Sequence, residues 1–279
     1  MELEIVVSDM PKLPDFEEPP LIEVVHGIQF EPIGISIVHP GQFYEVVAAR
    51  YPKVDTRDPL LPVREAFGPA AMLQQSFRLE MASAAEMPRS WFLSADDAFI
   101  VQLQKDRLLL NWRFVERGAS YPRYNGMRKE FNDLYGALEG FATNKQLGPV
   151  TPNQVEITYI SHFSADGTAT DGPDPAKYLS FFSRDHGPEW PIPMEALKLE
   201  ARYPLLGNDG TPKGRLYVVL LTVEKGGRRL LQLELTARGA PATPDLGGVA
   251  NFLDFAHKQI LNCFTGITTP AAHAAWRRR

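Results

Sequence analysis

Hydrophobic and polar residues alternate along several stretches of the chain, and this period of two is typical of β-strands that bury one face. The strands that the pattern predicts cover residues 21–30, 77–82, 90–94, 155–163 and 196–206, with hairpins over 99–114 and 215–237. Four prolines between Pro52 and Pro69 interrupt the pattern and predict a loop there.

A second pattern, with apolar residues every three or four positions, predicts two long helices over residues 125–142 and 249–265. In the first of them the apolar stripe consists of Met127, Phe131, Leu134, Leu138 and Phe141. Shorter helices are predicted over residues 40–51, 175–182 and 269–276.

The order of these elements occurs twice. The segment Ile22–Phe30 (IEVVHGIQF) returns as Val155–Phe163 (VEITYISHF), an offset of 133 residues (155 − 22 = 133), and Phe77–Glu80 is echoed by Leu197–Glu200. The second half reads strand, helix, three strands, helix, and the first half has the same order with the short strand 90–94 in addition. We therefore predict an α+β fold of two tandem β-α-β-β-β-α units. They would form a pseudo-twofold antiparallel sheet, either one continuous saddle or two packed sheets in a sandwich, with the long helices on one face.

The bulk composition bounds the domain organisation and the class of protein. With 44% hydrophobic and 23% charged residues, the chain is typical of globular proteins and excludes a disordered or fibrous one. We divide it into an N-terminal arm over 1–20 and two α+β repeats over 21–150 and 151–279, packed as one globular unit. The net charge of −5 argues against a general polyanion binder, although a local basic face remains an alternative.

Three further features predict a cytoplasmic protein. The single cysteine, Cys263, excludes an intramolecular disulfide. The first residues lack the pattern of a signal peptide, and the longest apolar run, Leu216–Leu221, is far too short to span a membrane.

The candidate site lies on the sheet face that alternates away from the long helices. Amide and guanidinium groups gather there, and such groups bind polar or anionic partners through directed hydrogen bonds. An antiparallel sheet with one solvated face and ordinary cross-strand ion pairs is the alternative explanation. The candidate binding residues on this face are Arg78, Glu80, Gln102, Gln104, Asn111, Arg113, Lys198, Glu200 and Arg202.

Two tyrosines, Tyr121 and Tyr124, complete the candidate set through a resemblance. The chain resembles a sporadically distributed bacterial protein family of similar length in three segments. These are the segment beginning Pro20–Leu21–Ile22, the run from Gln102 through Asn111–Trp112–Arg113, and Tyr121–Pro–Arg–Tyr124. The resemblance covers mainly residues 20–140. It implies that the glutamines, Asn111, Trp112, Arg113 and the two tyrosines are family hallmarks, and it implies no activity.

No catalytic or cofactor motif stands out. The six histidines are scattered without metal-ligand spacing, and the strand residues His26 and His162 are read as hydrogen-bonded histidines. A nucleophile elbow, a P-loop and a dinucleotide-binding glycine pattern are absent. The three terminal arginines, 277–279, are read as a solvated end. We expect no metal and no cofactor, and the sequence does not favour an enzyme.

We therefore expect a non-catalytic interaction or ligand-binding protein. It would present the polar sheet face, or the groove between the repeats, to a protein partner or a small anionic ligand. A homodimer is one form that such a partner could take. The alternative is a nucleic-acid-binding protein that uses the sheet face, which the acidic total charge disfavours.

Overall fold

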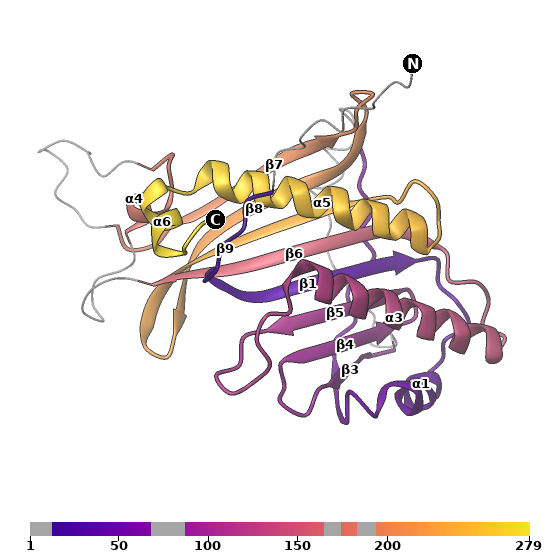
Figure 1. Cartoon of the computed structure of the whole chain (residues 1–279). Helices are drawn as coiled ribbons and strands as arrows, with labels where there is room; N and C mark the ends of the chain where they lie inside the picture. The colour runs from indigo at the N-terminus through magenta and orange to yellow at the C-terminus, as the bar shows by residue number, and fades with distance from the viewer. Residues whose placement is uncertain (1–12, 68–86, 165–173, 183–193) are drawn as a thin grey trace, which may run out of the picture.

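The computed structural model describes residues 13–67, 87–164, 174–182 and 194–279 (Figure 1). The predicted strand at 77–82, with the candidate residues Arg78 and Glu80, lies outside the described residues.

The strands form one continuous antiparallel sheet with the order β2-β3-β4-β5-β1-β6-β9-β8-β7. Their bounds are β1 (Leu21–Phe30), β2 (Lys53–Arg57), β3 (Arg89–Leu93), β4 (Phe99–Gln104), β5 (Arg107–Arg113), β6 (Pro152–Ser164), β7 (Lys198–Leu206), β8 (Pro212–Lys225) and β9 (Arg228–Gly239). The two strands that begin the halves of the sequence, β1 and β6, pair with each other at the centre of the sheet. Of the two sheet arrangements left open by the sequence, the structure therefore has the single sheet.

The long helices α3 (Arg123–Asn144) and α5 (Leu246–Ile267) lie side by side across one face of this sheet (Figure 1). The shorter helices are α1 (His39–Val47), α4 (Pro175–Tyr178) and α6 (Pro270–Ala275). Helix α1 packs beside α3 over β3, whereas α4 and α6 pack against each other near the end of α5.

The predicted apolar stripes form the core between the helices and the sheet. All five stripe residues of α3 are buried, and Phe131 and Leu138 have no exposed surface. In α5, Val249, Ala256 and Ile260 are likewise fully buried. Large apolar side chains of this kind each stabilise the fold by roughly 1.5–3 kcal/mol through burial, so the two stripes fix both helices on the sheet.

One sequence prediction about the loops is wrong. Residues 53–57, predicted as part of a loop, form the edge strand β2, which pairs with β3 from Lys53 opposite Leu93 to Arg57 opposite Arg89. All five residues of β2 are exposed, so this strand carries no buried apolar pattern that a sequence could reveal. Across the described part of the chain, none of the helices is both apolar enough and long enough to traverse a lipid bilayer.

Candidate functional site

The sheet face opposite the helices is crossed by the molecule's own chain. Residues 58–67, here called the strap, run over this face from β4 toward β8. Three glutamine side chains accept hydrogen bonds from strap backbone amides. Gln104 Oε1 accepts from Leu60 N at 2.9 Å, Gln29 Oε1 from Val63 N at 2.8 Å, and Gln154 Oε1 from Glu65 N at 3.3 Å.

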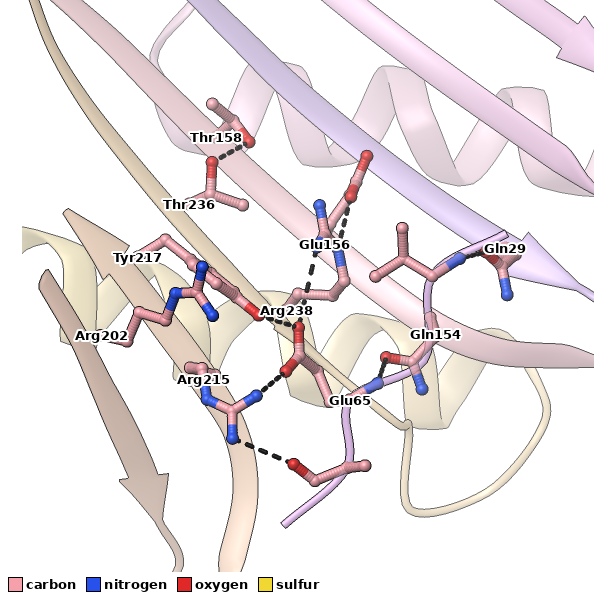
Figure 2. A network of polar contacts seen from close by, with 12 residues as sticks. Gln29, Glu65, Gln154, Glu156, Thr158, Arg202, Arg215, Tyr217, Thr236 and Arg238 are labelled. Carbon is pink, nitrogen blue, oxygen red and sulfur yellow. Dashed lines mark hydrogen bonds and ion pairs between the residues drawn. The ribbon is translucent and has the colours of Figure 1, made fainter. Parts of the chain in front are cut away.

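The strap ends at a buried carboxylate, that of Glu65 (Figure 2). Its side chain is 2% exposed and accepts hydrogen bonds from Arg215 Nη1 at 2.5 Å and from the Tyr217 hydroxyl at 2.7 Å. Arg238 lies 3.7 Å away and forms a closer pair with Glu156, at 2.8 Å. These contacts pair Arg215 of β8 and Arg238 of β9 within the chain, so the local basic face that the sequence left open is neutralised where the strap crosses it.

Three of the predicted binding residues are held in hydrogen bonds under or beside the strap. Gln102 accepts from Trp91 Nε1 at 3.1 Å and donates to Asn111 Oδ1 at 2.7 Å. Asn111 in turn donates to Glu23 Oε1 at 2.5 Å. Together with Gln104, these amides are buried, so their hydrogen-bonding groups join β3, β4, β5 and β1 rather than facing an open surface.

The remaining predicted sheet residues lie at the two ends of the face. Arg113 Nε donates to the backbone oxygen of Asp97 at 2.7 Å, which fastens the turn before β4. Lys198, Glu200 and Arg202 are exposed on the edge strand β7, where Glu200 and Arg202 form an ion pair at 2.6 Å. Among the predicted residues that the structure describes, the sheet residues and the two tyrosines therefore do not meet around one pocket.

A cavity of about 620 Å³ lies on the helix side of the sheet, between α3, α5 and the arm formed by residues 13–20. The two predicted tyrosines, Tyr121 and Tyr124, line it from the start of α3. The other half of the sequence contributes Tyr159 and Ser161 from β6 and His257 from α5. The apolar part of the lining consists mainly of Phe16, Leu21, Leu235, Ile260, Leu261 and Phe264.

The polar side of this cavity is a connected group of phenols around one imidazole. The Tyr124 ring stacks on the His257 ring, with 3.9 Å between centroids and 3° between planes. Tyr124 donates its hydroxyl hydrogen to Asp254 Oδ1 at 2.6 Å, and the Tyr159 hydroxyl lies 2.8 Å from His257 Nδ1. In the described part of the chain His257 Nε2 has no hydrogen-bond partner.

Burial keeps these groups uncharged at neutral pH. Desolvation lowers the pKa of His257 to about 4, although the nearby Asp254 acts in the opposite direction. Burial raises the pKa of Tyr121 to about 12, and it raises the pKa of Tyr159 well above its ordinary value. The pKa of Tyr124 is raised by burial first and by its hydrogen bond to Asp254 second. The phenols and the imidazole of the lining are therefore neutral hydrogen-bonding groups.

Behind Tyr124 lies His26 of β1, which is fully buried. Its ring sits 5.7 Å from the Tyr124 ring and 6.1 Å from the Phe131 ring, and neither ring nitrogen has a hydrogen-bond partner. The sequence interpretation of His26 as a hydrogen-bonded strand histidine is wrong, because β1 turns this side chain into the apolar layer under α3. Burial lowers its pKa to about 3, so it is a neutral ring in the core.

The arm closes one side of the cavity and is held by the C-terminus. Arg279 N donates to the Asp15 backbone oxygen at 2.9 Å, and Arg279 Nε donates to Glu17 Oε1 at 2.7 Å. Arg123 adds hydrogen bonds to the backbone oxygens of Phe16 and Glu17, at 2.6 and 3.0 Å. All three terminal arginines are exposed, as the interpretation of a solvated end expects, but Arg279 also holds the arm that forms the cavity wall.

Sequence reasoning selected Tyr121 and Tyr124 but missed the residues that complete the cavity. Tyr159 lies inside the strand segment predicted over 155–163 and His257 on the helix predicted over 249–265, and neither stands out there as a candidate site residue. The contact between Tyr159 and His257 spans 98 residues, and that between Tyr124 and Asp254 spans 130. The sequence echo between residues 22–30 and 155–163 was a partial signal, because two half-sized units usually pack against each other to bury their apolar sides.

Comparison with protein-family models gives no match for this chain, and a search of curated proteins gives none either.

Proposed function

We propose that this chain is a non-catalytic ligand-binding protein and that its binding site is the cavity between α3, α5 and the arm. One observation carries the proposal: a cavity of about 620 Å³ combines an apolar lining with a few convergent polar groups. Small-molecule sites have this character and occupy roughly 300–1,000 Å³. Both halves of the sequence contribute, so the site corresponds to the groove between repeats that the sequence predicts.

The opposite sheet face supports the proposal less well, because the strap occupies its centre. A protein partner there would have to bind beside the strap. The nucleic-acid alternative needs cations that are available to phosphates. Arg202 instead pairs with Glu200, and Arg238 pairs with Glu156. We therefore do not carry that alternative further.

We further infer that the two halves are tandem repeats related by a pseudo-twofold axis at the centre of the sheet. The support is the register of β1 against β6. Val25 lies opposite Thr158, a separation of 133 residues (158 − 25 = 133) that equals the offset of the sequence repeat. The flanking pairs Val24–Tyr159 and His26–Ile157 exchange under the same offset. Under this inference the proposed ligand cavity, which is lined by residues of both halves, lies where the two repeats meet.

The resemblance of residues 20–140 to a sporadically distributed bacterial family belongs to the same proposal. It is supported by the positions of its hallmark residues. Gln102 and Asn111 join strands of the sheet, and Trp112 is buried and donates from Nε1 to the Ala119 backbone oxygen at 2.9 Å. The hallmark residues Tyr121 and Tyr124 line the cavity. A family that shares them would share both the scaffold and one wall of the site.

The test is a fluorescence titration with N-phenyl-1-naphthylamine, an uncharged probe that brightens in apolar cavities. We expect saturable binding with one site per chain. The variant Leu261→Trp places a large ring in the cavity and should abolish the signal, since Leu261 lines it from α5.

The matched control is Asn262→Trp, the neighbouring position on α5. Asn262 is exposed and lies outside the cavity lining, so this variant should bind the probe as the parent chain does. Thermal unfolding of both variants shows whether the fold is retained. Binding that persists in a folded Leu261→Trp variant would exclude this cavity as the site.

A further inference from the structure

The charged groups around the cavity are already neutralised within the chain. Arg123 lies 3.4 Å from Asp15 and also donates to two backbone oxygens of the arm. Asp254 pairs with Arg128 at 3.2 Å and accepts the Tyr124 hydrogen bond. Within the described part of the chain, the lining has four charged side chains, those of Asp15, Arg123, Asp254 and Arg279, and the last of these pairs with Glu17. An ionised group of a ligand that lies against the apolar part of the lining would therefore lack an unpaired counter-ion, which is unfavourable.

The polar atoms that remain available in the lining are uncharged. Ser161 is 2% exposed and lines the cavity, and its hydroxyl makes no hydrogen bond to any described residue. His257 Nε2 is unpaired within the same part of the chain, and the imidazole carries no charge at neutral pH because burial lowers its pKa. Both side chains adjoin Tyr159, which lies two residues before Ser161 on β6 and bonds His257. The hydroxyl of Ser161 and Nε2 of His257 thus lie on the same wall of the cavity.

We propose that the ligand of this cavity is an uncharged, mainly apolar small molecule with one hydroxyl or carbonyl group, which bonds to Ser161 or His257. This inference rests on the proposed function and narrows it. Leu21, Leu235, Ile260 and Leu261 would surround the apolar body of the ligand. The small anionic ligand expected from the sequence is replaced by a neutral one, because the cations that suggested an anion lie on the other face of the sheet or are paired.

The experiment measures displacement of N-phenyl-1-naphthylamine by three compounds of nearly equal size: 2-naphthol, 2-methylnaphthalene and 2-naphthoate. One neutral hydrogen bond should make 2-naphthol bind about threefold to tenfold more tightly than the methyl compound. An unpaired buried charge should make 2-naphthoate bind about a hundredfold more weakly than 2-naphthol.

Two variants identify the polar partner. Ser161→Ala removes the hydroxyl, and His257→Phe removes the ring nitrogens while keeping a ring against Tyr124. The preference for 2-naphthol over 2-methylnaphthalene should fall in at least one of them, whereas binding of 2-methylnaphthalene should stay nearly constant. Circular dichroism confirms that each variant is folded.

The outcomes separate this inference from the proposed function. Binding of N-phenyl-1-naphthylamine with 2-naphthoate as the strongest competitor would overturn the neutral ligand and leave the site intact. An unchanged hydroxyl preference in both variants would overturn the assigned partners. If N-phenyl-1-naphthylamine itself does not bind the parent chain, the proposed function fails.

Discussion

Replacing Glu65 by Gln tests whether the strap is a structural part of the sheet. The substitution keeps the size of the side chain but removes the charge that faces Arg215 and Tyr217. Arg215 is 14% exposed and Glu65 is 2% exposed, so water screens this pair only weakly. Breaking a buried pair by removing one charge typically costs about 3–5 kcal/mol. Because Arg215 and Arg238 retain some solvent contact, we expect a loss of about 2–4 kcal/mol in the free energy of unfolding.

Urea unfolding followed by tryptophan fluorescence measures this loss, with Glu31→Gln as the matched control. Glu31 also pairs with an arginine of the strap, Arg64 at 2.6 Å, but their side chains are 54% and 63% exposed. An exposed pair of this kind contributes roughly 0–1 kcal/mol. Hydrogen exchange at the amides of Val63 and Glu65 should accelerate only in Glu65→Gln. Equal losses in the two variants, or no loss in either, would refute the view that the strap is anchored by its buried carboxylate.

Three further predictions follow from other buried groups. Burial lowers the pKa of His26 from 6.5 to about 3, so between these pH values the unfolded state takes up a proton that the folded state does not. The free energy of unfolding should therefore fall by about 1.4 kcal/mol for each pH unit from pH 6.5 toward pH 3. In urea titrations His26→Leu should reduce that slope and stabilise the chain at pH 7, and an unchanged slope would contradict the buried neutral ring. Burial raises the pKa of the Cys263 thiol to about 11, so native protein at pH 8 should react with a disulfide reagent far more slowly than urea-unfolded protein, and equal rates would show an exposed thiolate. Gly239→Ala should lower the unfolding temperature because an added Cβ would meet the Phe252 ring at 2.6 Å, whereas Gly266→Ala, with open space around it, should not.

The elements of the fold were predictable wherever a single face is buried. The strand over 21–30 has the predicted bounds, and α3 and α5 extend their predicted ranges by only a few residues. In these segments the apolar period determines both the type of element and its orientation. The fully exposed edge strand β2 has no such period. It forms because the free edge of β3 supplies backbone partners, which is a tertiary effect.

The site was predictable only in part, for a related reason. Gln102 and Gln104 alternate away from the helices as expected, but alternation alone cannot show that another segment of the chain covers them. The strap that bonds Gln104 has no hydrophobic period and contains Pro59 and Pro62, so its sequence predicts only a loop. Tyr124 and His257 meet only because β1 and β6 pair at the centre and bring α3 and α5 together. Such a contact becomes visible once the order of the strands is known.

The central claim is that residues from both halves of the sequence line a ligand cavity between α3, α5 and the arm. A crystal structure of the full chain with 2-naphthol measures this most directly. The account predicts the naphthalene ring beside Leu261 and Ile260, with its hydroxyl within hydrogen-bond distance of Ser161 or His257. Density for 2-naphthol on the strap side of the sheet, or a cavity filled by side chains of the protein itself, would contradict the account.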